Sequence, residues 1–368
     1  TGPVVAPAAR EQQSIARHGG AVLAARRHDH VVPRAVEERR EGAADGPGSE
    51  NGDAHARHPT HCAPSGSVDA VTAGMLFVDK PQGLTSHDVV ARARRALDTR
   101  RVGHAGTLDP MATGLLTLGV GPATRLLTYL VGLDKTYETT MRLGVATTTD
   151  DACSITFFDL GQRPAALEAV TQERLERGIR SLTGEIEQVP SAVSAIKVDG
   201  RRAYDRVRAG EEVELAARRV TVSAFEVLAV RRQADGIEVD ARIDCSSGTY
   251  IRALARDLGA DLRVGGHLTA LRRTRVGPFD TSRAVAVDDI APEALVPPAE
   301  VAAQLFPVLR VSDVQARDLG HGKTLAQPDS PDAEPLAAVD ARGRLVALVS
   351  VRAGVGRTLV GFPQEAAE

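Results

Sequence analysis

The sequence predicts a mixed α/β (α+β) protein with a large antiparallel sheet, followed by a small β-rich C-terminal domain. Apolar and polar residues alternate over residues 135–143, 220–230 and 237–245, which is the period of a half-buried strand. Apolar residues recur at helical spacing over residues 86–97 and 173–182. The chain has 368 residues, of which 43% are hydrophobic, so it is long enough for two domains with real cores.

The N-terminal segment differs in composition from everything that follows. Residues 1–73 contain none of the 7 Phe and 4 Tyr side chains of the chain, yet they hold six of its 10 histidines. Such a segment buries too little apolar surface to offset the entropy of ordering it, so we predict a disordered extension. The scattered spacing of the histidines gives no metal-ligand geometry.

A short strand and a basic helix are expected next. Residues 75–79 are an apolar run that Lys80-Pro81 ends with turn chemistry. Ser86 is expected to cap the helix over residues 86–97. The arginines on or just beyond its polar side suit either phosphate contacts or a solvated face: Arg92, Arg94, Arg95, Arg100 and Arg101.

Residues 101–114 have the composition of a functional loop. Their three glycines and one proline disfavour a regular helix or strand and favour special turn geometry. Asp109 precedes Pro110, and the residue before a proline is restricted to extended conformations. A carboxylate fixed in this way can act as a nucleophile or a base, although the same residues also suit an ordinary turn.

Further strands and helices follow this loop. A strand over residues 115–120 and a short helix over residues 123–130 are expected. The strands at 220–230 and 237–245 are expected to form an antiparallel hairpin that turns at Asp235-Gly236.

The helix expected after residue 249 contains an arginine in an unusual place. Its expected end is Gly259. Arg252 falls in the first turn, where the helix macrodipole disfavours a cation by some tenths of a kcal/mol. The pattern therefore predicts an anionic partner for Arg252.

Two features lie outside these elements. A basic cluster with Tyr204 interleaved suits a nucleic-acid groove: Arg201, Arg202, Arg206 and Arg208. Pro297-Pro298 indicates a linker, and short strands around residues 336–339 and 345–351 indicate a small β-rich appendage. Lys323 is either a nucleic-acid backbone contact or a solvated loop lysine.

Composition narrows the class of protein. The net charge of −3 gives no global basic field, so any nucleic-acid surface must be local. Cys62, Cys153 and Cys245 are far apart and form no Cys-x-x-Cys, which argues against a disulfide framework and against a zinc site. No apolar run of membrane-spanning length and no signal-peptide pattern is found, so the expected location is the cytoplasm.

The loop motif resembles that of a known enzyme family. Residues 104–114, His-Ala-Gly-Thr-Leu-Asp-Pro-Met-Ala-Thr-Gly, are similar to the H-x-G-x-L-D-P-x-A-x-G signature of the TruB family of tRNA pseudouridine-55 synthases. The resemblance extends from about residue 74 to about residue 277 and departs from the family at residues 153–158. Its further matching segments are residues 79–86, 135–137, 144–151, 189–204, 250–252 and 268–274.

The resemblance implies a role for each matching residue. Asp109 corresponds to the catalytic aspartate, and Arg252 to the arginine that pairs with that carboxylate and keeps it ionised and aimed. The residues implied to hold the flipped-out uridine are His104, Tyr137, Tyr250 and Leu271. The remaining candidates are RNA contacts at Arg201, Arg202, Arg272 and Arg273, and structural motif lysines at Lys80 and Lys197.

Fold and reaction follow from the same resemblance. It implies a pseudouridine synthase catalytic domain over 74–296 and a PUA-like RNA-binding domain over 297–368, after the disordered extension that composition predicts over residues 1–73. The expected reaction is isomerisation of uridine to pseudouridine at position 55 in the T arm (TΨC loop) of tRNA: the glycosidic bond is broken, the base turns over, and C5 is joined to C1′. Asp109 would act either as the nucleophile on the sugar or as the base on its 2′ position. No cofactor and no metal are implied, and the protein is expected to act as a monomer, without a membrane or an obligate protein partner.

Two other functions compete with this interpretation. A magnesium-dependent phosphotransferase also uses an aspartate near Thr-Gly, but it needs a second carboxylate close by, and residues 110–112 supply none. A tRNA-binding and folding module without catalysis would keep every basic cluster and would need no carboxylate. The combination of Asp109, Tyr137 and Arg252 favours catalysis.

Overall fold

The computed structural model describes residues 73–152, 163–191, 197–198, 201–202, 215–327 and 332–363. The expected disordered extension lies outside these residues except for Ala73. The segment 153–158 and Tyr204 also lie outside the described residues.

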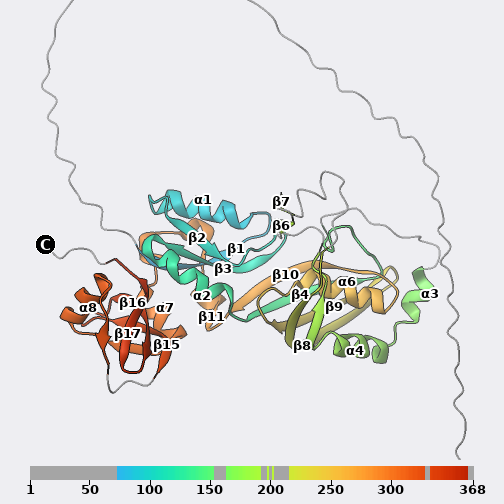
Figure 1. The fold of residues 1–368 in the computed structure, drawn as a ribbon. Helices are drawn as coiled ribbons and strands as arrows, with labels where there is room; N and C mark the ends of the chain where they lie inside the picture. Colours follow the sequence, from blue (N-terminus) through green and yellow to red (C-terminus); the bar gives the residue numbers. More distant parts are fainter. Residues whose placement is uncertain are drawn as a thin grey trace, which may run out of the picture. The chain divides into compact units, whose positions relative to one another are not determined.

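Most of the described strands belong to one large sheet (Figure 1). They are β1 (Gly74–Lys80), β2 (Val102–Ala105), β3 (Thr113–Val120), β4 (Lys135–Leu143), β5 (Gly184–Gln188), β8 (Arg218–Gln233), β9 (Gly236–Cys245), β10 (Gly266–Val276), β11 (Phe279–Asp280) and β12 (Val285–Ala286). Their spatial order is β12-β1-β3-β10-β4-β9-β8-β5, with β2 beside β3 and β11 beside β10. The predicted mixed α/β fold is confirmed, but the sheet is mixed and not purely antiparallel, because β1–β12 and β3–β10 are parallel pairs.

Three amphipathic helices pack on this sheet in one continuous core. They are α1 (Ser86–Ala96), α4 (Gln172–Ser181) and α6 (Ile251–Asp261). Their apolar stripes meet inward-facing strand residues in a single cluster that includes Val89, Leu175 and Leu254 from the helices and Leu116, Met141 and Ile243 from the strands. Full burial of each such side chain stabilises the fold by about 2 kcal/mol.

The remaining helices of this region are short. The helix expected at residues 123–130 is a 3-10 turn, η1 (Gly121–Leu126), continued by α2 (Leu127–Val131). A further short helix, α3 (Arg163–Glu168), precedes α4. The small strands β6 (Lys197–Val198) and β7 (Arg201–Arg202) pair with each other.

The N-cap of α1 is Thr85, which corrects the assignment to Ser86. The Thr85 hydroxyl accepts from the Asp88 N–H at 3.1 Å, and the Asp88 carboxylate accepts from the Thr85 N–H at 2.8 Å. This capping box contributes about 1 kcal/mol to the helix. Ser86 is the first helical residue, and its hydroxyl bonds the main chain of Leu108 instead.

Two glycines have other roles than the sequence predicted. The β8–β9 hairpin turns at Ala234-Asp235, and Gly236 already pairs with Gln233 as the first residue of β9. Gly259 lies inside α6, which ends at Asp261. A Cβ atom at Gly259 would lie 2.2 Å from the main chain of residues 265 and 266, so this glycine lets the helix approach β10 closely.

A second sheet forms the C-terminal part. Its order is β13-β15-β16-β17-β14, and it is accompanied by α7 and α8. The bounds are α7 (Pro298–Leu305), β13 (Val308–Arg310), α8 (Asp313–Gly320), β14 (Leu325–Ala326), β15 (Ala333–Val339), β16 (Leu345–Arg352) and β17 (Val355–Gly361). One apolar cluster joins Phe77 of β1 to Val301 of α7 and Leu348 of β16. The two expected strands are therefore present, and three more accompany them.

Candidate active site

Asp109 lies in the loop between β2 and β3, and neighbouring segments fix that loop on both sides. The hydroxyl of Ser86 accepts from the Leu108 N–H at 2.9 Å and donates to the Leu108 carbonyl at 3.1 Å. The Pro110 carbonyl accepts from the Gly83 N–H at 2.8 Å. The residues immediately before and after Asp109 are thus held by hydrogen bonds. The prediction that no regular strand enters residues 101–114 is wrong at both ends of the segment, because β2 begins at Val102 and β3 at Thr113.

Lys80 holds the same loop through hydrogen bonds to main-chain carbonyls. Its side chain is fully buried, and Nζ donates to the carbonyls of Leu84 at 2.7 Å, Pro81 at 3.0 Å and Pro110 at 3.4 Å. Burial lowers the pKa of Lys80 from 10.5 to about 8, against the opposing effect of the Asp109 carboxylate. The ammonium therefore acts as a compact donor that joins the turn after β1 to the turn after Asp109.

Arg252 supplies the cation beside Asp109. Its Nε atom lies 3.0 Å from Asp109 Oδ2, and one terminal nitrogen donates to the Thr149 carbonyl at 2.8 Å. The same nitrogen lies 3.8 Å from Asp151 Oδ2. The Arg252 side chain is 4% exposed and that of Asp109 is 37% exposed. Asp109 is thus the anionic partner expected for this first-turn arginine, and the carboxylate of Asp151 is a second anion near the same guanidinium.

A cavity of about 270 Å³ opens in front of this pair. Its lining brings together segments far apart in sequence: residues 106–109 of the loop, Lys135 and Tyr137 of β4, residues 247–252 at the start of α6, and Leu271 and Arg273 of β10. Tyr137 is buried, and burial raises the pKa of its hydroxyl. Burial also lowers the pKa of Lys135 to about 8. The cavity therefore combines one partly exposed carboxylate with buried basic side chains and with Tyr137 and Leu271.

Five of the six residues assigned to catalysis or to the base meet at this cavity: Asp109, Tyr137, Tyr250, Arg252 and Leu271. Tyr250 is held at the start of α6 by Gln188, whose side-chain amide bonds both the N–H and the carbonyl of Tyr250, at 2.8 and 3.1 Å.

His104 is the sixth, and it is not among the described residues that line the cavity. It lies on β2, opposite Leu118 of β3. Its ring meets that of His87 edge to face, with centroids 5.5 Å apart. Burial, with smaller contributions from His87 and Arg273, lowers the pKa of His104, which favours the neutral ring.

Arg272 and Arg273 do not have the freely exposed side chains expected of RNA contacts. Arg273 is 1% exposed and donates to the carbonyls of Leu115 at 2.8 Å and Gly106 at 3.0 Å. Arg272 donates to both carboxylate oxygens of Asp79, at 2.9 and 2.7 Å. Because the Arg273 guanidinium is buried under the loop and bonds main-chain carbonyls, it offers little surface to a phosphate, and its RNA contact stays a prediction.

Other basic residues are only partly placed. The backbones of Lys197, Arg201 and Arg202 form β6 and β7, but their side chains lie outside what the structure describes. On α1, Arg92 pairs with Asp288 at 3.1 Å and Arg94 donates to the Val102 carbonyl at 3.0 Å. Lys323 pairs with Asp318 at 2.8 Å.

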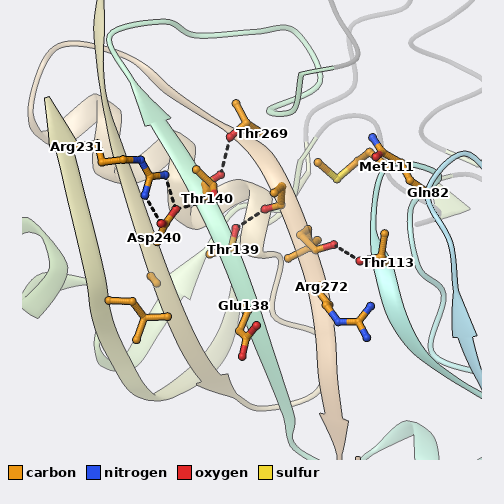
Figure 2. A pocket seen from close by; sticks show the side chains of 14 residues that line it. Gln82, Met111, Thr113, Glu138, Thr139, Thr140, Arg231, Asp240, Thr269 and Arg272 are labelled. Atoms are coloured by element: carbon orange, nitrogen blue, oxygen red, sulfur yellow. Dashed lines mark hydrogen bonds and ion pairs between the residues drawn. The ribbon is translucent and has the colours of Figure 1, made fainter. Parts of the chain in front are cut away.

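A second cavity, of about 510 Å³, lies over β4, β8, β9 and β10 (Figure 2). Its polar groups already bond one another: Thr139 donates to the Ala270 carbonyl at 2.8 Å, and Arg231 donates to both Asp240 oxygens. Leu271 lines both cavities. Because several of its polar side chains already bond protein groups, this cavity is the weaker candidate for chemistry.

Three supporting residues were not assigned roles from the sequence, Asp79, Thr149 and Asp151, and a fourth, Ser86, was assigned to the N-cap of α1 and not to the Asp109 loop. All four lie in segments that match the family pattern, so position along the chain pointed to them, but their partners are distant in sequence. In the described part of the chain, no group of three His, Cys, Asp or Glu residues suits a metal ion. No helix there is long and apolar enough to cross a membrane.

Family models match nearly the whole described chain. The model "TruB family pseudouridylate synthase (N terminal domain)" matches residues 94–251. "tRNA pseudouridylate synthase B C-terminal domain" matches residues 252–311, and "tRNA Pseudouridine synthase II, C terminal" matches residues 306–363.

Curated relatives and solved structures agree with these models. The chain is 58% identical over 300 residues to "tRNA pseudouridine synthase B" of Leifsonia xyli, covering 80% of this chain and 98% of the relative. It is 55% identical over 294 residues to the protein of that name from Thermobifida fusca, covering 78% and 98%. Among solved structures, "Crystal Structure of a Cbf5-Nop10-Gar1 Complex" is similar with a TM-score of 0.57 and 27% identity, covering 76% of this chain and 79% of the other. "Structure of H/ACA RNP bound to a substrate RNA containing 2'-deoxyuridine" has a TM-score of 0.59 at 24% identity, covering 80% and 87%, and so shares the fold.

Proposed function

Because the chain belongs to the TruB family of pseudouridine synthases, we propose that it isomerises uridine to pseudouridine in tRNA, at position 55 of the T arm. The observation that carries this proposal is the geometry at Asp109. A partly exposed carboxylate, held at 3.0 Å by a buried guanidinium, faces a cavity that Tyr137 and Leu271 line.

Five residues of the cavity have a place in the reaction. The target uridine leaves the base stack and enters the cavity, where Tyr137, Tyr250 and Leu271 hold its ring. Asp109 reacts with the sugar, either as a nucleophile or as a base at the 2′ position. The bond between the base and C1′ breaks, the base turns over, and C5 bonds to C1′. Arg252 orients the Asp109 carboxylate through these steps.

The chain divides into two domains in this proposal. Residues 74–296 form the catalytic domain and residues 297–368 a PUA-like domain that contacts RNA. Arg201 and Arg202 are candidate RNA contacts. Because the proposed substrate is tRNA, we place the protein in the cytoplasm. We expect it to act as a monomer without an obligate protein partner. Light scattering of the pure protein tests the monomer directly.

One assay tests the reaction itself. The protein is incubated with an unmodified tRNA transcript whose uridines carry tritium at C5, because joining C5 to C1′ releases that tritium to water. We expect one equivalent to be released per transcript, and none from a transcript with cytidine at position 55. Tight tRNA binding without release would refute the enzymatic proposal and support the tRNA-binding and folding module.

A further inference from the structure

The pairing of β3 with β10 connects two parts of the catalytic cavity, the Asp109 loop and Leu271. β3 continues from the Asp109 loop, whereas β10 carries Leu271. The two strands pair in parallel over Arg272–Thr113 and Arg273–Gly114. At Gly114 a Cβ atom would lie 2.2 Å from the Arg273 carbonyl oxygen, so the main chains touch here without an intervening side chain. The relative position of Asp109 and Leu271 therefore depends on this short junction.

Side chains secure the junction on both faces of the sheet. Arg273 reaches under β3 and donates to Leu115 and Gly106 on the face of the Asp109 loop. On the opposite face, Arg272 of β10 reaches across β3 to Asp79 of β1. Because β3 lies between β1 and β10, this ion pair spans the strand. Arg272 stands opposite Thr113 and Asp79 opposite Leu115, one on each side of Gly114.

The geometry of the Asp79–Arg272 pair is that of a structural contact. Two parallel N–H bonds to both carboxylate oxygens form the strongest and most directional arrangement available to arginine. In Figure 2 the Arg272 guanidinium points from β10 toward β3. Glu138 of β4 stands opposite Arg272 on the other side. With a carboxylate on either side, Arg272 attracts an RNA phosphate less than an unpaired arginine would.

We propose that Asp79 and Arg272 are positioning residues for the isomerisation: their ion pair across β3 fixes the Asp109 loop relative to Leu271 and Tyr137. This inference rests on the proposed function. It replaces the assignment of Arg272 as an RNA contact, and it gives Asp79 a role in the rate of the chemical step. Neither side chain touches the substrate.

A double-mutant cycle tests the pair. The variants are Asp79→Asn, Arg272→Gln and the two together, and the readouts are the single-turnover rate at saturating enzyme and the tRNA dissociation constant at two salt concentrations. We expect each single variant to react about tenfold more slowly. The double variant should be no slower than either single one, whereas independent effects would multiply to about a hundredfold. The dissociation constant and its salt dependence should stay within twofold of wild type.

Controls separate positioning from folding and from RNA binding. The pair Arg283–Glu300 has similar exposure and a 2.9 Å contact, so Arg283→Gln and Glu300→Gln should leave the rate unchanged. Arg272→Lys keeps the charge and the aliphatic stem; it should melt within a few degrees of wild type yet still react several-fold more slowly, because an ammonium does not bridge both oxygens.

Three results would overturn the inference. The first is a normal rate for Arg272→Lys, and the second is multiplicative effects in the double variant. The third is weaker, less salt-dependent binding for Arg272→Gln while Asp79→Asn is neutral, which would restore Arg272 as a phosphate contact. A wild-type protein that releases no tritium would refute the proposed function as well, whereas an active wild type with unaffected variants would refute this inference alone.

Discussion

Replacing Arg252 by lysine tests whether geometry as well as charge is needed beside Asp109. The guanidinium contacts Asp109 through Nε at 3.0 Å and the Thr149 carbonyl through a terminal nitrogen at 2.8 Å. Lysine has one ammonium on a flexible stem and cannot occupy both positions at once. We expect it to keep one contact and to lose the other.

The size of the effect follows from the loss of alignment. If the ammonium stays with Thr149, the Asp109 carboxylate loses its directional bond and moves by about 1 Å, which costs on the order of a hundredfold in rate. Arg252→Lys keeps a positive charge at the site, so the free energy of unfolding should change little. Arg252→Gln removes the cation and leaves the buried Asp151 without it, at a cost of about 3 kcal/mol in the free energy of unfolding.

Single-turnover rates and thermal melting distinguish the two losses. Arg252→Lys should be slow but stable, and Arg252→Gln should be slow and less stable, with tRNA affinity nearly preserved in both. If Arg252 instead contacts a phosphate, lysine should serve almost as well, and any loss should appear as weaker, more salt-sensitive binding. A near-normal single-turnover rate for Arg252→Lys would refute the assigned role of the Asp109–Arg252 pair.

Three more expectations concern Asp109, the N-terminal extension and Lys135. Asp109→Asn should abolish product formation while tRNA affinity stays within a few-fold; turnover above about a thousandth of wild type would exclude the carboxylate from its central role. Deleting residues 1–70 should leave turnover and melting temperature almost unchanged, since residues 1–73 have no aromatic side chain to pack; a fall of several degrees would contradict this. The pKa of Lys135 is lowered from 10.5 to about 8, so between these values the unfolded chain holds a proton that the folded protein has released. Stability relative to Lys135→Met should therefore rise with pH across this window, by up to about 3 kcal/mol, and urea titrations at pH 7.5 and 10 that show no such rise would contradict it.

Local patterns in the sequence determined most of the strands and the central loop. Alternation over residues 135–143 and 237–245 predicted β4 and β9 within a residue, because a half-buried strand requires that period. The Asp109-Pro110 pair predicted a fixed carboxylate, since proline restricts its predecessor wherever the loop lies. The placement of Arg252 in a helix's first turn predicted an anionic partner, and the resemblance to the family identified it as Asp109.

The tertiary structure alone decided how arginines, glycines and hydroxyls are used. Arg272 and Arg273 are neighbours in β10, but successive side chains of a strand point to opposite faces of the sheet. Arg272 therefore bonds Asp79, whereas Arg273 bonds the Gly106 carbonyl under the loop. Serine is a common N-cap residue, yet the Ser86 hydroxyl bonds the main chain of Leu108, and Thr85 caps α1 instead. Each of these outcomes depends on a partner many residues away along the chain. A periodic pattern records which face of an element is buried, but it does not record what lies opposite that face.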